Sequence, residues 1–584
     1  MKRNYIGLSN TFHDSALAVV NEDGKVVFAE ATERYLQNKR AINCIPDFFQ
    51  RASEIVDQYC DKDAELVLAQ TWSDNAEEAM IRGLADITEQ ESKLSSNGRG
   101  VPVFIRSNLA ALKFFYVSQL TAIKQTTNTL MYELHQKEDD TAFQRVSSRK
   151  YNHHLTHAAA ACYTSPFSEG VCAVIDAIGE NSSTHCYYFK DGVLSEIEGV
   201  DSQSAGSLGA FYMYICNACG FGQLTGEEWK VMGLASYGKL NRRLADTFRD
   251  SIKVNGLSIE YAPMPEFMDF FQDLYKVKRK KGEPVINAAD IAYTGQLVFT
   301  EIYYTFLRNL QQLGLSKNLI IGGGCALNSS ANGKVVEETG FEKLHIYSAP
   351  ADDGNAIGAA FLAYYEDNRD KKYVPEVHSP YLGSQMCDDK LEKLFKYGPV
   401  KQERLSYEEI YKRTAEQIAR GKIVGWVQGA AEFGPRALGN RSILADPRDP
   451  DMKDKINAHV KFREEFRPLA PSILHEYGHE YFENYQEAPY MERTLSFRDG
   501  VKHLVPSVVH RDGTGRLQTV KKEWNDKYYE LISAFHQLTG VPVLLNTSFN
   551  VMGKPIIHTV EDALSVFYTS GLDVLVLNDY YIEK

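Results

Sequence analysis

Hydrophobic and polar residues alternate in a regular order over residues 5–30. The apolar segment YIGLS is followed by the polar loop NTFHDS, a second apolar segment ALAVV, the dipeptide Asp23-Gly24 and a third segment, KVVFAE. An Asp-Gly pair between two such segments is a strong signal for a β-hairpin. The pattern therefore predicts three consecutive strands joined by one polar loop and one tight turn.

The same order recurs over residues 172–198. CAVID, the polar loop AIGENSS and THCYYF are followed by Asp191-Gly192 and VLSEIEG. Aligning the two Asp-Gly pairs also aligns His13 with Asn181. A duplicated three-strand meander is typical of the α/β, ribonuclease-H-like fold of actin, Hsp70 and sugar kinases. In that fold the loops after the two first strands face each other across a cleft that holds a nucleotide.

A glycine-rich loop follows a further predicted strand, KNLII, at residues 317–321. The loop reads GGGCALN and opens a predicted helix. Because glycine has no side chain, backbone N–H groups there can approach a phosphate or a ribose. We therefore expect Gly322, Gly323, Gly324 and Asn328 to line a nucleotide site. The chain has no GxxxxGK[ST] sequence, so a Walker loop is not expected.

Residues outside these repeats suggest how the rest of the chain is organised. Residues 75–150 contain helix-like stretches such as AEEAMIRGLADITEQ, which indicate an insertion or lid rather than sheet. The polar segment 373–400 carries Pro and Gly and is predicted to be a linker. It separates a predicted N-terminal domain, 1–372, from a second α/β domain at 401–584.

Composition narrows the class of protein. The 584 residues exceed what one hydrophobic core usually supports, and 44% hydrophobic with 24% charged residues is typical of a globular protein. No apolar run approaches the ~18 residues that span a membrane. Nine scattered cysteines suit a reducing cytoplasm, and a net charge of −13 argues against a general nucleic-acid surface. We expect a cytoplasmic enzyme or regulator.

Two histidines and two carboxylates form the best metal candidate. In the sequence NHHLTHAAA, His153 and His157 are four residues apart, so on a helix they share one face and can share a cation. Asp176 ends the predicted strand CAVID, and Asp352 lies in a strand-to-helix turn. Such a set would suit Fe(II), Mn(II) or Zn(II), and the ligand types alone do not choose among them. The alternative is an ordinary helix with polar residues.

Two further patterns resemble metal or redox sites but are interpreted as structural. His475-Glu476-Tyr477-Gly478-His479 fits the HExxH pattern of zinc proteases, yet its glycine weakens a helix. Cys216 and Cys219 form a lone CxxC without a second pair, which favours core packing.

Basic residues are concentrated in EFGPRALGNRSILADPR and KFREEFRPLAP, which lie between residues 432 and 471. Arg436, Arg441, Arg448, Lys461, Arg463 and Arg467 stand there among Gly and Pro rather than along a smooth helical face. An arginine fork stays charged and matches phosphate or carboxylate oxygens two at a time. The segment therefore predicts a pocket for a compact polyanion, against the alternative of a solvated charged helix.

Two single residues are candidates for the cleft of the duplicated fold. His13, followed by Asp14, lies in the first loop, where it could act as an acid, a base or an oxyanion donor. Lys230 lies in GEEWKVMGLASYG. The alternatives are a structural histidine and a surface lysine beside a glycine turn.

Motifs in order along nearly the whole chain resemble those of the O-carbamoyltransferase family (NodU/CmcH and TobZ-like enzymes). They are IGLSNTFHDSALAVV, HHLTHAAAA, VIDAIGE, SLGAFY, EEWKVMGLASYG, GGGCALN, EFGPRALGNRSILADPR, KFREEFRPLAP, RDGTGRLQTV and LLNTSFN. The resemblance implies an N-terminal part similar to the transferase that makes threonylcarbamoyladenosine in tRNA. The C-terminal part would be similar to a YrdC-type carbamoyl-adenylate synthase.

The resemblance also implies a two-step reaction. The C-terminal domain would convert carbamoyl phosphate and ATP, with Mg²⁺, into carbamoyl adenylate, releasing pyrophosphate and phosphate. The N-terminal domain would then pass the carbamoyl group to a hydroxyl of a small-molecule acceptor: a natural product, a sugar or a nucleoside. No organic cofactor is implied, and members of the family are often homodimers.

Individual roles carry over position by position. The resemblance implies Fe(II) at His153, His157, Asp176 and Asp352, with His13 as the catalytic histidine and Gly322–Asn328 holding the adenosine. The carbamoyl phosphate and ATP pocket would contain the following residues: Arg436, Lys461, Arg467, Arg516, Asn546 and Ser548.

The chain departs from the family pattern in two places. It has TERY followed by LQNKRAINC where EERF and a basic cluster are common, and Asp352-Asp353 where one acid is usual. We expect Asp352 to be the ligand, from its distance to Gly354. Two rival interpretations stay open: a sugar-kinase-like phosphotransferase and a nucleotide-responsive binding protein.

Overall fold

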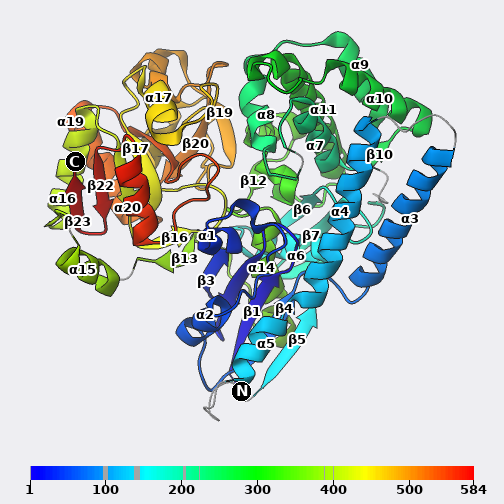
Figure 1. The fold of residues 1–584 in the computed structure, drawn as a ribbon, viewed down its shortest axis with the longest axis horizontal. Helices are drawn as coiled ribbons and strands as arrows, with labels where there is room; N and C mark the ends of the chain where they lie inside the picture. The colour runs from blue at the N-terminus through cyan, green and yellow to red at the C-terminus, as the bar shows by residue number, and fades with distance from the viewer. Residues whose placement is uncertain are drawn as a thin grey trace. The chain divides into compact units, whose positions relative to one another are not determined.

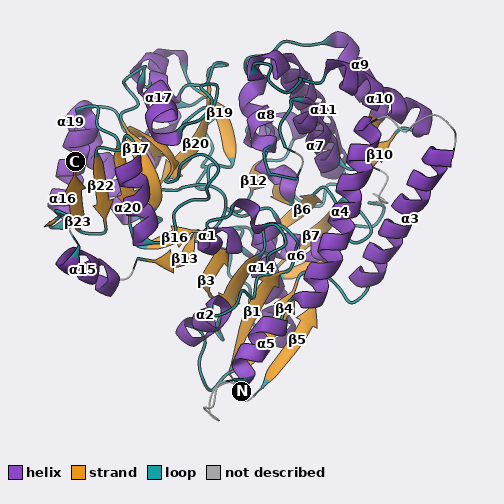
Figure 2. Cartoon of the chain, viewed as in Figure 1, coloured by secondary structure: helices purple, strands orange, loops and turns teal. Residues whose placement is uncertain are grey.

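The computed structural model describes residues 2–96, 103–136, 145–200, 206–222, 224–386, 388–398 and 400–584. Figures 1 and 2 show its helices and strands. The chain forms two compact units. The first contains Met1–Thr32, Arg40–Asn328 and Val335–His378, and the second contains Glu33–Lys39, Ser329–Lys334 and Ser379–Lys584.

A five-stranded sheet in the first unit is built on the first predicted meander. Its order is β3-β2-β1-β4-β5, and β1 pairs antiparallel with β2 but parallel with β4. Gly24 turns between β2 and β3 with a φ of 81°, a conformation that favours glycine. In sheet order the strands are Val26–Ala31, Ala16–Val20, Arg3–Ser9, Glu65–Gln70 and Val146–Lys150.

A second five-stranded sheet repeats this topology. Its order, read from the matching edge, is β8-β7-β6-β11-β12, with β6 antiparallel to β7 and parallel to β11. In that order the strands are Val193–Glu196, Thr184–Lys190, Glu169–Ile175, Asn318–Gly322 and Lys343–His345. The prediction of an α/β, duplicated ribonuclease-H-like fold is therefore confirmed.

Two helices, α6 (His153–Tyr163) and α14 (Asn355–Asp367), pack on these sheets and on each other. Small residues let the backbones come close. A Cβ at Gly7 of β1 would lie 1.7 Å from the carbonyl oxygen of Ala356, and one at Gly358 would lie 1.9 Å from that of Thr156. These contacts leave room only for hydrogen, so they fix where α6 presents its histidines.

Helices fill most of the predicted insertion. They are α3 (Ala76–Ser96), α4 (Val103–Gln125) and α5 (Asn128–His135). Residues 97–102 and 137–144 of that range lie outside the described residues. The last five residues of the range form strand β5, so the expectation of helix was wrong there. Their alternating pattern, VSSRK, pairs in parallel with β4.

A nine-stranded sheet forms the centre of the second unit, in the order β14-β23-β22-β15-β17-β21-β18-β20-β19 among the described residues. In that order the strands are Glu403–Arg404, Tyr580–Glu583, Val574–Leu577, Val424–Val427, Arg441–Ala445, Val543–Ser548, Ala470–Leu474, Thr514–Val520 and Arg493–Ser496. Helices α16 (Tyr407–Ala419) and α19 (Asp526–Thr539) pack against each other.

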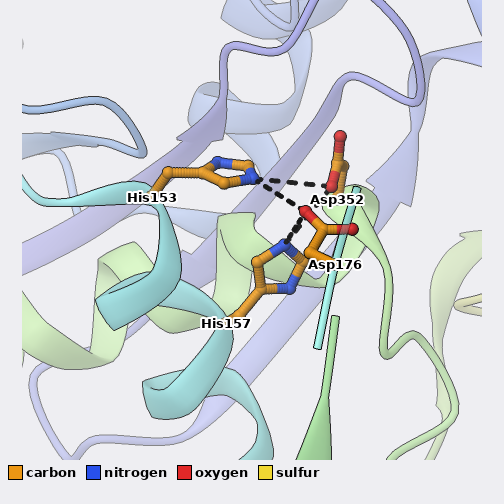
Figure 3. A group of neighbouring side chains, drawn as sticks. All are labelled: His153, His157, Asp176 and Asp352. Atoms are coloured by element: carbon orange, nitrogen blue, oxygen red, sulfur yellow. Dashed lines mark ion pairs between the residues drawn. The ribbon is translucent and has the colours of Figure 1, made fainter. Parts of the chain in front are cut away.

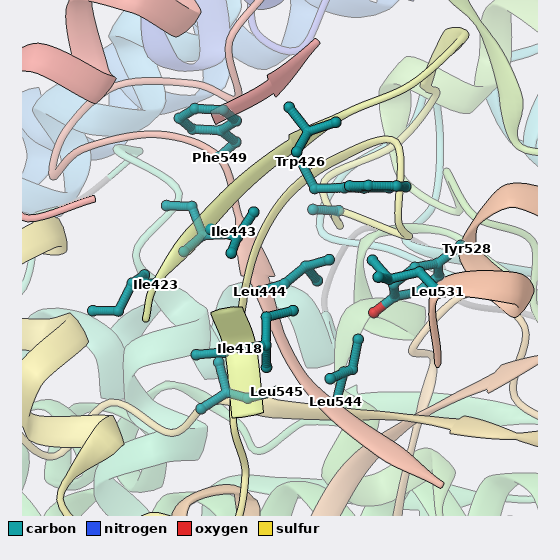
Figure 4. Packing of buried hydrophobic residues seen from close by; sticks show 14 of the residues in the cluster. Ile418, Ile423, Trp426, Ile443, Leu444, Tyr528, Leu531, Leu544, Leu545 and Phe549 are labelled. Carbon is teal, nitrogen blue, oxygen red and sulfur yellow. The ribbon is translucent and has the colours of Figure 1, made fainter. Parts of the chain in front are cut away.

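The core of this unit lies between the sheet and these helices. Trp426, Leu444 and Leu545 come from the strands, while Ile418 and Leu531 come from the helices (Figure 4). All five side chains are buried. Burial of this apolar surface stabilises the sheet that carries Arg516, Asn546 and Ser548.

Two short stretches of the N-terminal half belong to the second unit. Arg34 Nη2 donates a hydrogen bond to the carbonyl oxygen of Gly434 (2.5 Å), and Asn332 Nδ2 donates to that of Glu492 (2.9 Å). A Cβ at Gly333 would lie 1.8 Å from the carbonyl oxygen of Thr494. The second unit is therefore assembled from three separate stretches of chain.

The predicted linker, 373–400, is not a stretch without structure. It contains β13 (Tyr381–Gln385), which pairs antiparallel with β16 (Ala430–Glu432), and helix α15 (Asp388–Tyr397). Residues 387 and 399 lie outside the described residues. Pro380 precedes the paired strand and Gly383 lies within it, so proline and glycine do not mark a stretch without structure here.

Candidate metal centre and anion site

Four buried side chains predicted to bind a metal meet in the first unit. His153 and His157 project from the same face of α6, Asp176 follows β6 directly, and Asp352 begins the short helix η4 (Asp352–Gly354). One ligand atom from each lies within 4.8 Å of the others. Figure 3 shows the two imidazoles and the two carboxylates pointing toward a common centre.

The spacing of these atoms fits a shared cation. His153 Nε2 lies 3.5 Å from Asp176 Oδ2 and 3.7 Å from Asp352 Oδ1, and the corresponding distances from His157 Nε2 are 3.6 and 3.3 Å. These are longer than good hydrogen bonds. Ligands placed tetrahedrally ~2.0–2.1 Å from a metal lie ~3.3–3.4 Å apart. His157 Nε2 is buried without a hydrogen-bond partner among the described residues.

The negative charge of the carboxylates at this centre also favours the binding of a cation. Burial alone would lower the pKa of His157, but Asp176 and Asp352 raise it to about 9. Burial would raise the pKa of Asp176, but the adjacent imidazoles of His153 and His157 hold it well below its usual range. A divalent transition metal bound here would take the place of the proton that the carboxylates hold on His157, because imidazole nitrogens and carboxylate oxygens form a donor set that suits such a metal.

The start of α6 is held in place by capping. The Asn152 side chain accepts a hydrogen bond from the backbone N–H of Leu155, and Glu180 accepts one from that of His153 (3.2 Å). The Trp72 ring stacks on the His153 ring, with centroids 4.3 Å apart. The first ligand is therefore fixed through both its backbone and its ring.

The predicted nucleotide loop contacts the metal candidates. Gly323 has a φ of 87°, and a Cβ there would lie 2.4 Å from the carbonyl oxygen of Ile175. The backbone N–H of Gly324 donates to Asp176 Oδ1 (3.0 Å), which leaves Asp176 Oδ2 facing the histidines. Gly322 ends β11, and Asn328 exchanges two amide hydrogen bonds of 3.1 Å with Gln296.

The geometry separates the two adjacent acids. Asp352 belongs to the cluster, and Asp353 Oδ1 instead accepts a hydrogen bond from the backbone N–H of Gly354 (3.0 Å). Ser9 Oγ donates to the carbonyl oxygen of Asp352 (2.6 Å), which ties this turn to the end of β1.

His13 lies beside the cluster. Its Nδ1 is 3.5 Å from Asp352 Oδ2 and 3.0 Å from Asp14 Oδ2. Arg40, which the sequence did not single out, donates from Nε (2.9 Å) and Nη2 (2.7 Å) to Asp14 Oδ2 and from Nη1 to the carbonyl oxygen of Leu224 (3.0 Å). Burial would raise the pKa of Asp14, but the charge of Arg40 holds it well below its usual value.

Lys230 lies on helix α8 (Glu228–Ala235) of the same unit. Its ammonium group forms an ion pair with Glu227 and lies 5.2 Å from the centre of the Phe221 ring. The structure thus gives Lys230 a local acidic partner.

In the second unit, Arg436 and Arg516 carry charges that no carboxylate among the described residues balances. Both side chains are half-buried. Burial lowers the pKa of Arg436 well below its usual value, and Arg516 lowers it further; burial lowers the pKa of Arg516 itself to about 10. Two half-buried cations that influence each other, with Arg516 Nε buried and without a hydrogen-bond partner among the described residues, suit a site that receives an anion.

Three more basic groups lie near these arginines. Burial lowers the pKa of Lys461 well below its usual value, with Arg463 and Arg467 adding to the effect. Lys461 Nζ donates only to neutral acceptors among the described residues, the Ser548 carbonyl and hydroxyl and Asn550 Oδ1. Arg467 pairs with Glu464 (2.5 Å). Lys461, Arg467 and Ser548 are thus part of the predicted set that the structure brings together.

Asn546 and Arg463 have different surroundings. Asn546 Nδ2 donates to Gln518 Oε1 (2.9 Å) and to Ser472 Oγ (3.2 Å) inside the sheet, so its amide N–H groups are used structurally. Arg463 belongs to the basic segment that predicts the pocket, but not to the residues that the family resemblance places there. Burial lowers its pKa to about 9, with Arg467 and Arg516 adding to the effect, and its Nε donates to Asn457.

Two arginines of the same motif are structural. Arg441 is fully buried and donates to four carbonyl oxygens, those of Gln428, Gly429, Asn440 and Ser384. Arg448 pairs with Asp446 at 2.6 Å. Arg441 and Arg448 are therefore not candidates for the predicted anion site.

The HExxH pattern does not form a metal site. Its residues are divided between the short helices η6 (His475–Tyr477) and α18 (Gly478–Tyr481), and His475 Nδ1 contacts the Tyr485 hydroxyl at 3.1 Å. Within the described parts of the chain, His153, His157, Asp176 and Asp352 are the one group positioned to hold a metal. None of the described helices is both long enough and apolar enough to cross a membrane.

Two family models match this chain, one over the part that contains the histidine and aspartate cluster and one over the part that contains the basic residues. The family model "Carbamoyltransferase N-terminus" matches residues 4–361, and "Carbamoyltransferase C-terminus" matches residues 415–584. Nodulation protein NolNO of Sinorhizobium fredii (strain NBRC 101917 / NGR234) is 34% identical over 597 residues, covering 100% of this chain and 80% of that protein. Nodulation protein NolO of Bradyrhizobium diazoefficiens is 35% identical over 443 residues, covering 74% and 79%. Among solved structures, HypF of T. kodakarensis aligns with a TM-score of 0.31 and 13% identity, over 65% of this chain and 49% of that one.

Proposed function

This chain belongs to the carbamoyltransferase family, and on that premise we propose an ATP-dependent O-carbamoyltransferase that works in two steps. The second unit forms carbamoyl adenylate, and the first unit transfers its carbamoyl group to a hydroxyl of a natural product, sugar or nucleoside. The observation that carries the proposal is the pair of half-buried cations at Arg436 and Arg516, which have no acidic partner among the described residues and suit two phosphorylated substrates.

The first step requires two polyanions to meet. Water cleaves carbamoyl phosphate to carbamate and phosphate, a carbamate oxygen attacks the α-phosphorus of ATP, and pyrophosphate leaves. Such chemistry needs mainly positioning and neutralisation of charge, with Mg²⁺ bound to the nucleotide. Arg436 and Arg516 are available for bidentate contacts to phosphate oxygens, and Lys461 and Arg467 add charge nearby.

In the second step an acceptor hydroxyl attacks the carbamoyl carbon, AMP leaves, and the hydroxyl proton is lost. His13 lies beside Asp352 and is our candidate to take that proton or to stabilise the developing charge. His153, His157, Asp176 and Asp352 would hold a divalent metal such as Fe(II), which when bound would polarise the carbamoyl carbonyl as a Lewis acid.

Incubation of the protein with ATP, Mg²⁺ and carbamoyl phosphate tests the proposal. Pyrophosphate and carbamoyl adenylate are expected, and ¹⁴C from carbamoyl phosphate should then appear in a hydroxylated acceptor selected from a panel of sugars and nucleosides. ADP without pyrophosphate would instead identify a phosphotransferase. Nucleotide binding without turnover would identify a nucleotide-responsive binding protein.

A further inference from the structure

The two nitrogens of the His153 ring face different surroundings. Nε2 points toward Asp176 and Asp352. Nδ1 lies on the other side of the ring, where the side-chain amide of Asn355 is 3.5 Å away, measured to Nδ2. Both residues are buried, with 1% and 0% of their surfaces exposed, so water does not readily replace this contact.

When one nitrogen of an imidazole binds a metal, the protonation state of the second nitrogen is fixed. The nitrogen that binds the metal offers its lone pair, so a neutral ring carries its proton on the other nitrogen, and that N–H needs an acceptor. At His153 the N–H must therefore be on Nδ1. An amide N–H group cannot accept it, because it is itself a donor.

Asn355 holds an unused acceptor at the right place. Its Oδ1 is buried and has no hydrogen-bond partner among the described residues. Turning the planar amide by 180° exchanges the positions of Oδ1 and Nδ2, so the oxygen faces His153 Nδ1 and gains a donor. The same rotation of the Asn355 amide means that its N–H group no longer faces the N–H group of His153.

We propose that Asn355 is a positioning residue that accepts a hydrogen bond from the Nδ1–H of His153 and so directs the Nε2 lone pair to the metal. This rests on the proposed function only in requiring that the cluster binds a metal. Asn355 follows Asp352 by three residues, and its backbone N–H donates to the Asp352 carbonyl oxygen. One helical turn thus supplies both a ligand and the group that orients a ligand.

Trp72 and Asn355 determine different aspects of the orientation of the His153 ring. Stacking on Trp72 fixes the plane of the His153 ring, with 19° between the two ring planes. Stacking does not decide which nitrogen faces the carboxylates, because a ring turned over in the same plane stacks equally well. The hydrogen bond to Asn355 makes that choice.

Titration of the metal-free, full-length protein with Co²⁺ tests the proposal by affinity and by the visible spectrum of the bound ion. Asn355→Leu should bind Co²⁺ about 10–100-fold more weakly than the wild type. Asn355→Asp, which keeps an acceptor, should bind within a few-fold of the wild type. Asn318→Leu is the matched control. Asn318 lies at the start of β11, the end away from Gly322 and the metal ligands, and its side chain donates a hydrogen bond to the Glu169 carbonyl.

Each outcome has one meaning. If the wild type binds no Co²⁺ or Fe²⁺, the metal in the proposed function is wrong. If the wild type binds and Asn355→Leu binds equally tightly, the role of Asn355 is wrong. Should Asn355→Leu fail to fold, the Co²⁺ spectrum of Asn355→Asp decides, because a carboxylate acceptor should shift the absorption bands and an unchanged spectrum would overturn the proposal.

Discussion

The guanidinium group of Arg40 lies 2.9 Å from His13, measured from Nη2 to Nδ1. The same Nη2 lies 2.7 Å from Asp14 Oδ2, so one side chain holds both members of the His13–Asp14 pair. Arg40 reaches this position from an irregular loop in which Gln37, Arg40, Ala41 and Asn43 all have positive φ. Such a run of strained residues is usually kept where function requires it.

Replacing Arg40 by Lys should impair transfer specifically. Lysine keeps the charge opposite Asp14 but lacks the planar fork that contacts two residues. We expect kcat for ¹⁴C-carbamoyl incorporation to fall about 10–100-fold, the size typical of a lost positioning contact, while pyrophosphate release is unchanged. Arg249→Lys, at an exposed pair with Glu301, serves as the control. Equal rates for the two variants would contradict a role for Arg40.

Replacing His13 by Asn should stop the second step and spare the first. Loss of a group that moves a proton or stabilises charge costs about 10²–10⁴-fold. Incorporation of ¹⁴C into the acceptor should therefore fall by that factor, and carbamoyl adenylate should accumulate. A loss of pyrophosphate release in His13→Asn would show that the two sites are assigned to the wrong units.

Replacing Arg436 by Met should abolish adenylate formation without destabilising the protein. The variant loses a charge-assisted contact to phosphate but also removes a half-buried cation that has no acidic partner among the described residues. Pyrophosphate release should fall at least about 100-fold, and the melting temperature without substrates should be equal or higher.

Arg448→Met is the matched control for that change. It leaves the buried Asp446 without its 2.6 Å partner, so it should lower the melting temperature and leave pyrophosphate release near the wild-type rate. A melting temperature that falls in Arg436→Met as it does in Arg448→Met would argue against an open anion site.

Removing the metal should separate the two activities. Protein dialysed against a chelator and returned to excess Mg²⁺ should still release pyrophosphate but should transfer no carbamoyl group. His157→Ala should behave in the same way without a chelator, because it removes one of the four ligands. Added Fe²⁺ should restore transfer to the dialysed wild type and not to the variant. Full transfer by the metal-free protein would contradict the assignment.

Asp47 should make stability depend on pH in an unusual direction. Its buried Oδ2 accepts hydrogen bonds from the N–H groups of Thr129 and Leu130 (3.1 Å each), and burial raises its pKa from 3.8 to about 6. Between about pH 4 and 6 the folded protein keeps a proton that the unfolded chain releases. The stability that this group contributes at low pH is therefore lost as pH rises through 6.

Asp47→Asn removes this titration while keeping an oxygen acceptor. The free energy of unfolding of Asp47→Asn, relative to the wild type, should rise by on the order of 3 kcal/mol between pH 4 and pH 7. Urea denaturation at several pH values measures it. A difference that does not change with pH would show that Asp47 titrates normally in the folded protein.

The sequence allowed some of these features to be predicted for physical reasons. The period of two in the meanders specifies strands, and spacing of four on a helix places His153 and His157 on one face. Asp176 and Asp352 could be predicted because they end a strand and begin a turn. The same reasoning could not separate Arg436 from Arg441, since the motif does not reveal that Arg441 donates to four carbonyl oxygens.

Other features depend on contacts between distant segments. Arg40 reaches His13 through a loop with no period, so no pattern marks it. The orientation of Asp176 depends on the N–H of Gly324, which is 148 residues away along the chain. The strand within 373–400 could not be predicted, because a strand that pairs with residues 430–432 resembles a loop when its partner is unknown.

The three-part assembly of the second unit limits how a gene for this enzyme can be divided. A break before Ser379 would separate most of the second unit from Glu33–Lys39 and Ser329–Lys334, which supply Arg34 and Asn332 to it. The released polypeptide would lack these hydrogen bonds and would have to recover the segments from the other product. A polypeptide that begins at Ser379 is therefore expected to be less stable by itself than the same residues are in the whole chain.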